Sequence, residues 1–386
     1  MRCLKILSGC CAILVAMPGG ASAADAADVA APLRTLRAVG NDGSNSEAAA
    51  AAWDALSQQP ASQLPVMLRA LDDAGPIAAN WIRGAIDAVA AREIEQPGGL
   101  PIAELEAIVV DRKHQPRARR IAFEWLTRAD TTAADRLVPN MLDDPGLEFR
   151  RDAVARILSS AEKIPADNPR DQRLALYRQA LNGARDEDQI KTIAERLAGL
   201  GQTVDLAQHF GFLRDWQVIG PFDNADRQGF AAVFPPEEKI DLKATYAGKD
   251  PNRMVQWTEL RSREEYGKVD LNPLYDNAKQ AVAYAWTEFR SSSAQDLELR
   301  LSCKNAWKVW LNGELLFERE EYHRGTQFDQ YQLKAHMRPG SNEILVKVCQ
   351  NEETQPWTVE WQFQLRVCDA LGTAVYSQPV TGDRNE

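Results

Sequence analysis

Residues 307–315 read WKVWLNGEL, and this stretch decides the fold of the C-terminal half of the chain. Trp307, Val309 and Leu311 stand at alternating positions, which is the period of a β-strand. Asn312 and Gly313 follow, and an Asn-Gly pair between two apolar runs is the strongest short-range signal for a β-hairpin. The stretch therefore predicts two antiparallel strands joined by a two-residue turn.

The same alternation continues on both sides of this hairpin. Leu297, Leu299 and Leu301 alternate with polar residues, which is the pattern of a half-buried strand. Further strands are expected near 215–219, 255–260, 281–289, 344–348 and 359–367. Roughly eight to ten strands separated by turn signals predict an antiparallel β-sandwich over residues 213–380. The alternating positions of Trp286, Trp307 and Trp361 favour the core of that sandwich over an exposed platform.

Two segments of this region resemble one known family. Residues 307–315, followed by MRPGSNEILVKV at 337–348, look like the hairpin and the later strand of the galactose-binding-like jelly roll. The resemblance covers about 280–376 and implies a non-catalytic module of the kind that accompanies many glycoside hydrolases. Residues 216–224 are similar to the entry strand of such modules in large exported bacterial proteins. In this family the sugar-binding residues lie on variable loops.

The loops after the hairpin and between the last strands offer side chains of the kinds that hold sugars in proteins. Sugars are held by aromatic faces, while carboxylates, amides and arginines bind the hydroxyl groups. Trp357 is expected to be exposed because Gln355-Pro356 interrupts the strand before it. The candidate ligand-binding residues are Glu318, Tyr322, His323, Arg324, Asn351, Glu352 and Trp357.

The first half of the chain has the spacing of paired helices. Apolar residues recur every three or four positions from about residue 64 to residue 197, which is the period of amphipathic helices. Asp72 to Pro76 and Asp143 to Gly146 provide cap and breaker residues between partners, so that the repeating unit is roughly 32 to 40 residues long. We expect a helical repeat domain over 45–212.

Residues 144–158 resemble the HEAT repeat, and residues 111–126 are a looser copy. The resemblance covers 45 to about 160 and implies an α-solenoid, in which stacked helix pairs share a continuous core. An irregular helical bundle is the alternative. By the same resemblance, Arg151 or Arg120 would reach from an inner helix to a turn aspartate. The fold class expected for the chain is α+β in two domains, an N-terminal HEAT-like or armadillo-like α-solenoid and a C-terminal jelly roll.

The N-terminus has the pattern of a secretory signal peptide. A basic start precedes an apolar run from Ile6 to Met17, and Ala21-Ser22-Ala23 supplies a cleavage site. We expect cleavage near Ala23 and export to the periplasm or cell envelope, with an extension at 24–44 and a tail at 381–386. A lipobox at Cys10 is the alternative, but it would leave a second apolar run in the mature chain. The apolar run is too short for a transmembrane helix.

Charge and cysteines limit the partners further. The formal charge of the chain is -10, and removal of Arg2 and Lys5 takes it to -12, which disfavours nucleic acid and anionic lipid as partners. Three cysteines remain after the signal segment, Cys303, Cys349 and Cys368. If a disulfide forms, Cys349 and Cys368 on neighbouring strands are the preferred pair, and three reduced core cysteines are the alternative.

No catalytic, metal or cofactor motif is found. His114, His209, His323 and His336 are isolated, with no zinc spacing, and neither a serine-hydrolase elbow nor a phosphate loop is present. We therefore expect a non-catalytic exported binding or scaffold protein without cofactors, whose sandwich binds a glycan and whose helices dock a protein partner. The alternatives are a purely structural interaction protein, or a polysaccharide hydrolase or its accessory subunit that uses Glu318, Glu320 and Glu321.

Overall fold

The computed structural model describes residues 23–40, 44–165 and 170–379. The predicted signal segment lies outside these residues except for Ala23, and so does the predicted tail. In the described part of the chain, no helix combines the length and the apolar character needed to cross a membrane.

The chain is an α+β protein that divides into two compact units, Met1–Ala153 and Val154–Glu386. The second unit contains helices α9, α10 and α11 as well as all of the strands. Strand β1 (Asp215–Asp223) begins after α11 (Leu206–Phe210). The second compact unit therefore begins some 60 residues before its first strand.

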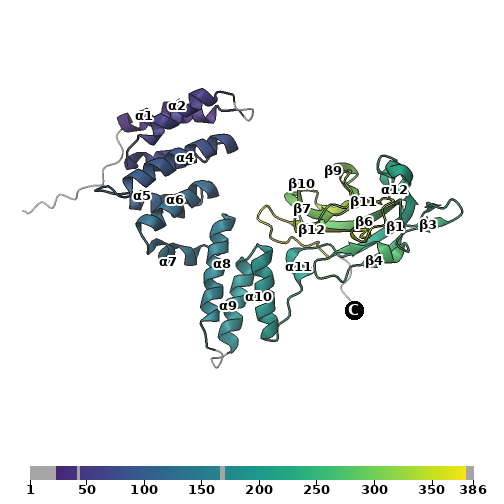
Figure 1. The fold of residues 1–386 in the computed structure, drawn as a ribbon. Coiled ribbons are helices and arrows are strands. Elements are labelled where there is room, and N and C mark those ends of the chain that lie inside the picture. The colour runs from purple at the N-terminus through teal and green to yellow at the C-terminus, as the bar shows by residue number, and fades with distance from the viewer. Residues whose placement is uncertain (1–22, 41–43, 166–169, 380–386) are drawn as a thin grey trace, which may run out of the picture. The chain divides into compact units, whose positions relative to one another are not determined.

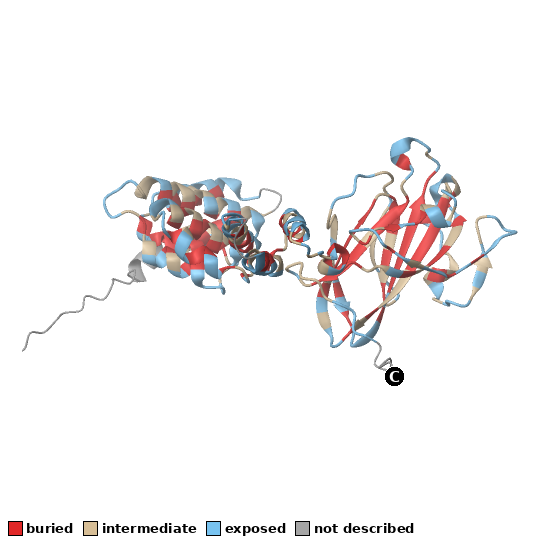
Figure 2. Ribbon diagram, turned by 90° about the horizontal axis from the view of Figure 1, so that it is seen from below, coloured by how far each residue is buried: buried red, intermediate tan, exposed pale blue. Residues whose placement is uncertain are grey.

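The first unit consists of helices in antiparallel pairs around one apolar core (Figures 1 and 2). Pro76 and Pro116 begin two of these helices, where a proline costs no hydrogen bond because the first N–H groups of a helix have no partner within it. The helices are α1 (Ala23–Arg37), α2 (Ser46–Ser57), η1 (Ala61–Gln63), α3 (Leu64–Arg69), α4 (Pro76–Glu93), α5 (Ile102–Val110), α6 (Pro116–Ala129), α7 (Ala133–Leu137), η2 (Val138–Asn140) and α8 (Leu147–Glu162), which crosses into the second unit.

A buried arginine of α6, Arg119, binds the turn aspartate that precedes α8. Arg119 donates two hydrogen bonds to the carboxylate of Asp144, at 2.8 and 2.7 Å, and both residues are fully buried. Arg120 pairs instead with Asp152 on α8, and Arg151 is exposed. Arg119 reaches this aspartate because it lies on the buried face of α6, together with Ala122 and Leu126.

The second unit begins with α9 (Arg170–Gly183) and α10 (Glu187–Gly199), followed by α11. Segment 206–212 packs on the sheets through the ring cluster of Phe210, Phe212, Tyr266 and Phe328. The buried Arg366 guanidinium donates to the Phe210 carbonyl at 3.1 Å, which fixes the C-terminal end of α11 on strand β12.

Within residues 170–379 the main strands form two antiparallel sheets, of order β4-β1-β6-β11-β8-β9 and β10-β7-β12-β5 (Figure 1). The strands besides β1 are β2 (Thr245–Ala247), β3 (Met254–Gln256), β4 (Thr258–Arg261), β5 (Val269–Asp270), β6 (Ala281–Ser291), β7 (Gln295–Cys303), β8 (Ala306–Leu311), β9 (Glu314–Arg319), β10 (Tyr331–Met337), β11 (Gly340–Gln350) and β12 (Gln362–Cys368). Short helices in the connections are η3 (Ala225–Phe230), α12 (Pro235–Glu238), η4 (Asn272–Leu274) and η5 (Pro356–Thr358).

The predicted Asn-Gly hairpin is confirmed. Strands β8 and β9 pair antiparallel, with Leu311 opposite Glu314. Asn312 and Gly313 both have positive φ, 53° and 82°, as a two-residue turn with the right twist requires.

Both faces of the six-stranded sheet carry an apolar cluster. Side chains on one face, including Val346 and Val348, share a core with the four-stranded sheet. The opposite face, called the outer face below, carries a second apolar cluster that includes Leu345 and Cys349 and is covered by residues from segment 222–257. Successive residues of β11 therefore point into two different cores, as the pleat of a strand requires.

The predicted disulfide between Cys349 and Cys368 is not formed. Cys303, Cys349 and Cys368 are free, buried thiols. The expectation assumed neighbouring strands, but β11 and β12 belong to different sheets. All three cysteines act as small apolar core residues.

Candidate functional site

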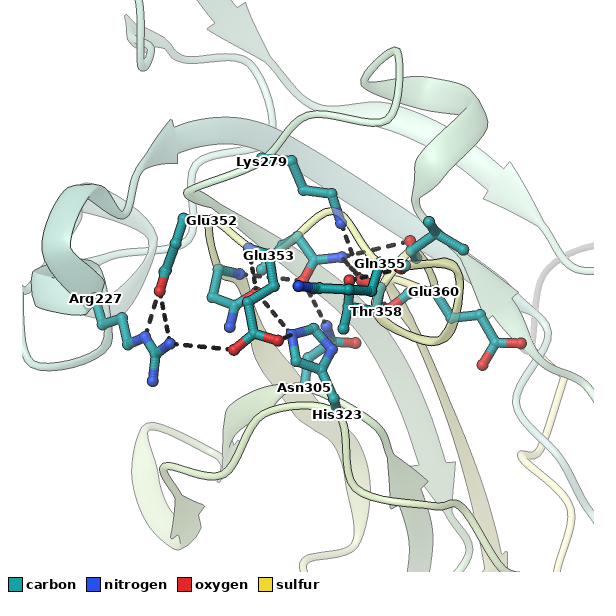
Figure 3. Close-up of polar contacts among 12 residues, drawn as sticks. Arg227, Lys279, Asn305, His323, Glu352, Glu353, Gln355, Thr358 and Glu360 are labelled. Carbon is teal, nitrogen blue, oxygen red and sulfur yellow. Dashed lines mark hydrogen bonds and ion pairs between the residues drawn. The ribbon is translucent and has the colours of Figure 1, made fainter.

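Loops at one end of the six-stranded sheet bring together four of the seven predicted site residues, of which Figure 3 shows His323 and Glu352. His323 lies in the loop between β9 and β10, and Asn351 and Glu352 lie in the loop between β11 and β12. The segment after β1 lies against them, because the Asn224 N–H bonds the Gln280 carbonyl and the Gln280 N–H bonds the Asn351 carbonyl. Three segments that are distant in the sequence therefore form one loop cluster.

Asn351 is the centre of this cluster. Its side chain is fully buried, and its Oδ1 atom accepts from the Glu353 N–H at 3.2 Å and lies 2.7 Å from His323 Nε2. An amide oxygen only accepts, so Nε2 of His323 carries a proton. The Nδ2 group of Asn351 has no hydrogen-bond partner among the described residues.

Arg227 connects the acidic loop to Tyr322. Its guanidinium donates to both carboxylate oxygens of Glu352, at 2.6 and 3.3 Å, and to Glu353 at 3.4 Å. This hydrogen bond holds the pKa of Glu352 below its ordinary value, so that the carboxylate stays charged. The same guanidinium lies 5.2 Å from the ring centroid of Tyr322, the fourth predicted residue of the cluster.

Burial raises the pKa of the Tyr322 phenol to about 12, which keeps it neutral at physiological pH. The phenol oxygen accepts a hydrogen bond from Asn224 Nδ2 at 3.2 Å, and the same amide donates to the Gln350 carbonyl at 2.9 Å. Asn224 and Arg227 were missed at the sequence level, where segment 216–224 was identified only as a strand entering the sandwich.

Trp357 lies on a firmly held turn at the same end of the sheet. The carbonyl of the next residue, Thr358, accepts from Lys279 Nζ at 2.9 Å and from Gln350 Nε2 at 3.2 Å. The Gln350 side chain is in turn bonded to Asn305 (Figure 3). Thr358 is fully buried, whereas Trp357 is 69% exposed. The expected exposure of Trp357 is confirmed.

Glu318 and Arg324 form separate ion pairs. Glu318 on β9 pairs with Lys308 at 2.9 Å, and Arg324 pairs with Glu321 at 2.6 Å. Arg319 and Arg324 lower the pKa of Glu321 to about 2. Because a glycosidase needs one carboxyl that stays protonated near neutral pH, Glu321 is unsuited to that role.

A second arrangement, on the outer face, was not predicted. Trp286 and Trp310 are half-buried and line a groove of about 260 Å³ together with Glu238, Glu343 and Leu345. Trp307 and Trp361 are buried in the core shared by the two sheets, as expected, whereas Trp286 is only partly buried and packs against the outer-face cluster.

A buried charge lies beside this groove. Lys347 on β11 has no exposed surface and pairs with Glu237 of α12 at 2.7 Å, and the Tyr284 hydroxyl donates to the same carboxylate oxygen. Burial lowers the pKa of Lys347, although Glu237 opposes the shift. The ion pair fixes α12 on the sheet.

Among the described residues, no three histidine, cysteine or acidic side chains are placed to hold a metal ion.

Comparisons with known proteins do not assign this chain to a family. No family model matches the chain, and no curated protein matches it. Similar solved structures include the β-glucosidase of Kluyveromyces marxianus, at 12% identity and a TM-score of 0.26, with 65% of this chain and 36% of that chain covered. The same enzyme in complex with glucose gives 12% identity, 69% and 35% coverage and a TM-score of 0.26. The GH31 α-xylosidase of Xanthomonas citri gives 11% identity, 29% and 15% coverage and a TM-score of 0.17. The chain spans about a third or less of these proteins, and likenesses this low assign it neither a family nor an activity.

Proposed function

We propose that this chain is a non-catalytic, exported binding protein of the cell envelope. In this proposal the sheets form a galactose-binding-like jelly roll that binds carbohydrate through Trp357 and the loop cluster centred on Asn351, at the same end of the six-stranded sheet. The N-terminal helices form a HEAT-like solenoid that docks a protein partner, and the signal segment directs the chain out of the cytoplasm. The sequence resemblances and the geometry of the loops support this function.

The observation that carries the proposal is the exposure of Trp357. Tryptophan side chains that stabilise a fold are buried, as Trp307 and Trp361 are. Trp357 presents 69% of its surface to solvent from a turn whose next residue is hydrogen-bonded and buried. An aromatic face held in this way suits stacking against the C–H surface of a sugar ring, because little conformational freedom is lost on binding.

The loop cluster at the same end of the sheet offers polar groups that can bind the hydroxyl groups of a carbohydrate. Arg227, Glu352 and Glu353 are 42%, 44% and 39% exposed and are oriented by one another. Charged acceptors and donors that are already oriented form strong, directional hydrogen bonds with hydroxyl groups. The lowered pKa of Glu352 keeps this acceptor ionised well below neutral pH.

A glycan array tests the proposal directly, with the full chain and two single variants. We expect the full chain to bind at least one short glycan, and Trp357→Ala to lose that binding by roughly tenfold or more. Val359→Ala is the matched control, since Val359 is exposed in the same loop but has no aromatic face. Equal binding by the Trp357→Ala variant would overturn the proposed site, and no binding by the full chain would overturn the proposed function.

A further inference from the structure

The outer face of the six-stranded sheet carries one continuous row of side chains. Residues directly opposite each other on paired strands share a face. The register pairs Glu259 with Gln217 and Gln217 with Trp286. It continues from Trp286 to Leu345, from Leu345 to Trp310 and from Trp310 to Leu315. The row therefore crosses all six strands, over about 24 Å at ~4.8 Å between strands.

Two hollows follow this row and share Trp286. One, of about 410 Å³, is lined by Gln217, Glu259 and Trp286, and the other, of about 260 Å³, by Trp286, Leu345 and Trp310. Trp286 and Trp310 flank Leu345 on either side, about 10 Å apart by the strand spacing. The outer face thus has an elongated groove with an indole between its two halves.

One wall of the groove is rigid. Residues Pro236 to Ile240 form it, and Glu237 in this wall is bonded to both Lys347 and Tyr284 on the sheet below. Lys347 donates further to the carbonyls of Phe230 and Ala232, at 3.2 and 2.6 Å. The groove therefore exists before any ligand arrives.

The chemistry of the lining favours a carbohydrate. Indole rings provide apolar surface, and the exposed carboxylates of Glu238, Glu259 and Glu343 provide acceptors for hydroxyl groups. A peptide would be expected to pair with an edge strand rather than cross six strands. Acidic residues outnumber Arg261 and Lys239 in the lining, which disfavours an anionic ligand.

We infer that this outer-face groove binds a linear oligosaccharide, which lies across the strands and stacks on Trp286 and Trp310. The ligand class rests on the proposed function, but the residues differ from those of the loop cluster at Trp357. A chain spanning the groove contacts several sugar units at once, so that affinity rises with chain length.

Native affinity electrophoresis tests this inference with the full chain in gels that contain soluble xylan, mixed-linkage β-glucan, galactomannan or dextran. We expect at least one polymer to retard the chain, and both Trp286→Ala and Trp310→Ala to weaken that retardation roughly tenfold. Trp310→Phe should keep much of the binding, because it keeps an aromatic face. Met254→Ala, at an exposed apolar residue of β3, is the matched control and should bind as the original chain does. Thermal melts of each variant report whether the fold is intact.

The variants separate the two sites. Retardation that survives in Trp357→Ala but is lost in the two groove variants supports the groove. Retardation unchanged in both groove variants, or absent with all four polymers, overturns it, while the short-glycan array still decides the loop cluster. If the Trp310→Phe variant is retarded as weakly as the Trp310→Ala variant, that result also contradicts stacking of the sugar on Trp310.

Discussion

Lys347 is a buried ammonium group whose hydrogen-bonding capacity is fully used. An ammonium group has three donors, and Lys347 has three acceptors, the carbonyls of Phe230 and Ala232 and the carboxylate of Glu237. A buried charge without such partners would cost several kcal/mol. The residue therefore stabilises the position of segment 230–237 on the outer face.

Replacing Lys347 by methionine should be strongly destabilising. Lys347→Met leaves the largely buried carboxylate of Glu237 without its cation, and we expect the free energy of unfolding to fall by about 3–5 kcal/mol. Urea denaturation followed by tryptophan fluorescence measures this loss. Glu237→Gln in the same chain should restore part of it, because the unpaired charge is then gone.

The matched control is the exposed pair of Arg261 and Asp215, in which each side chain is more than 60% exposed. Arg261→Ala should change stability by about 1 kcal/mol or less. A loss in Lys347→Met as small as this would contradict the structural role of the buried pair.

The three thiols should be unreactive while the chain is folded. Burial raises the pKa of Cys303 and Cys349 from 9.0 to about 12, and the thiolate is the reactive form. Mass spectrometry after iodoacetamide treatment at pH 8 should find these residues unmodified in the native chain and fully modified in denaturant. A disulfide between Cys349 and Cys368 would instead block both after denaturation.

The same shifts give a dependence of stability on pH. Because the folded pKa of these thiols lies above the unfolded value, the neutral thiol favours the folded state. Their contribution is fully present below pH 9.0 and is lost as the pH rises from 9.0 to about 12.

At the scale of elements, one ion pair organises the turn between α7 and α8. Arg119 of α6 binds both carboxylate oxygens of Asp144, and its Nε atom donates to the Val109 carbonyl at the end of α5. Asp144 also accepts from the Gly146 N–H at 2.8 Å. The end of α5 and the turn before α8 are therefore both held by the buried pair of Arg119 and Asp144.

Asp144→Ala should destabilise the helical unit by about 3–5 kcal/mol, because it leaves the Arg119 guanidinium buried without an anion. Denaturation followed by far-ultraviolet circular dichroism reports the loss of helix. Glu124→Ala is the matched control, since Glu124 pairs with Arg83 at the surface, and it should cost about 1 kcal/mol or less. Equal losses in the two variants would contradict the role of Asp144.

The sequence predicted elements well where the signal is local. The turn at Asn312-Gly313 depends on two residues, and the structure has it. The sequence did not tell which of the two apolar clusters Trp286 joins, because both faces of β6 are apolar. Ala283 and Ala285 face the shared core, while Tyr284 and Trp286 face outward, so that alternation alone does not tell which face is inside.

At the scale of the whole molecule, α11 belongs structurally to the sheets. Its last residue, Phe210, packs on Phe212 and Phe328, and its carbonyl accepts from the buried Arg366. Residues 154–386, which include α11 and the strands, also form one compact unit. The strands should therefore be less stable without the helix that precedes them.

We expect fragment 154–386 to melt cooperatively, and fragment 213–386 to melt at least about 5 °C lower. The shorter fragment lacks Phe210 and Phe212 and leaves a donor of Arg366 unpaired, and 1 kcal/mol corresponds to roughly 2–4 °C in a unit of this size. Differential scanning calorimetry measures both temperatures. Equal melting temperatures would show that α11 contributes nothing to the sandwich.

The loop cluster depends on contacts that no local pattern contains. Arg227 and Glu352 are 125 residues apart in the sequence, and Asn224 and Gln350 are 126 apart. They meet because β1 pairs with β6 and β6 pairs with β11. The sequence could therefore suggest Tyr322, His323, Asn351 and Glu352 by their chemistry, but only the strand order supplies Asn224 and Arg227.

A thermal-shift screen of the full chain against a broad panel of soluble glycans tests the central claim, that the sandwich binds carbohydrate. A ligand that binds only the folded state raises the melting temperature, and at a hundred times its dissociation constant it stabilises by about 2.7 kcal/mol. We predict a concentration-dependent rise with at least one glycan, and a smaller rise in a chain that carries Trp357→Ala, Trp286→Ala and Trp310→Ala. A melting temperature that no glycan changes would contradict the claim.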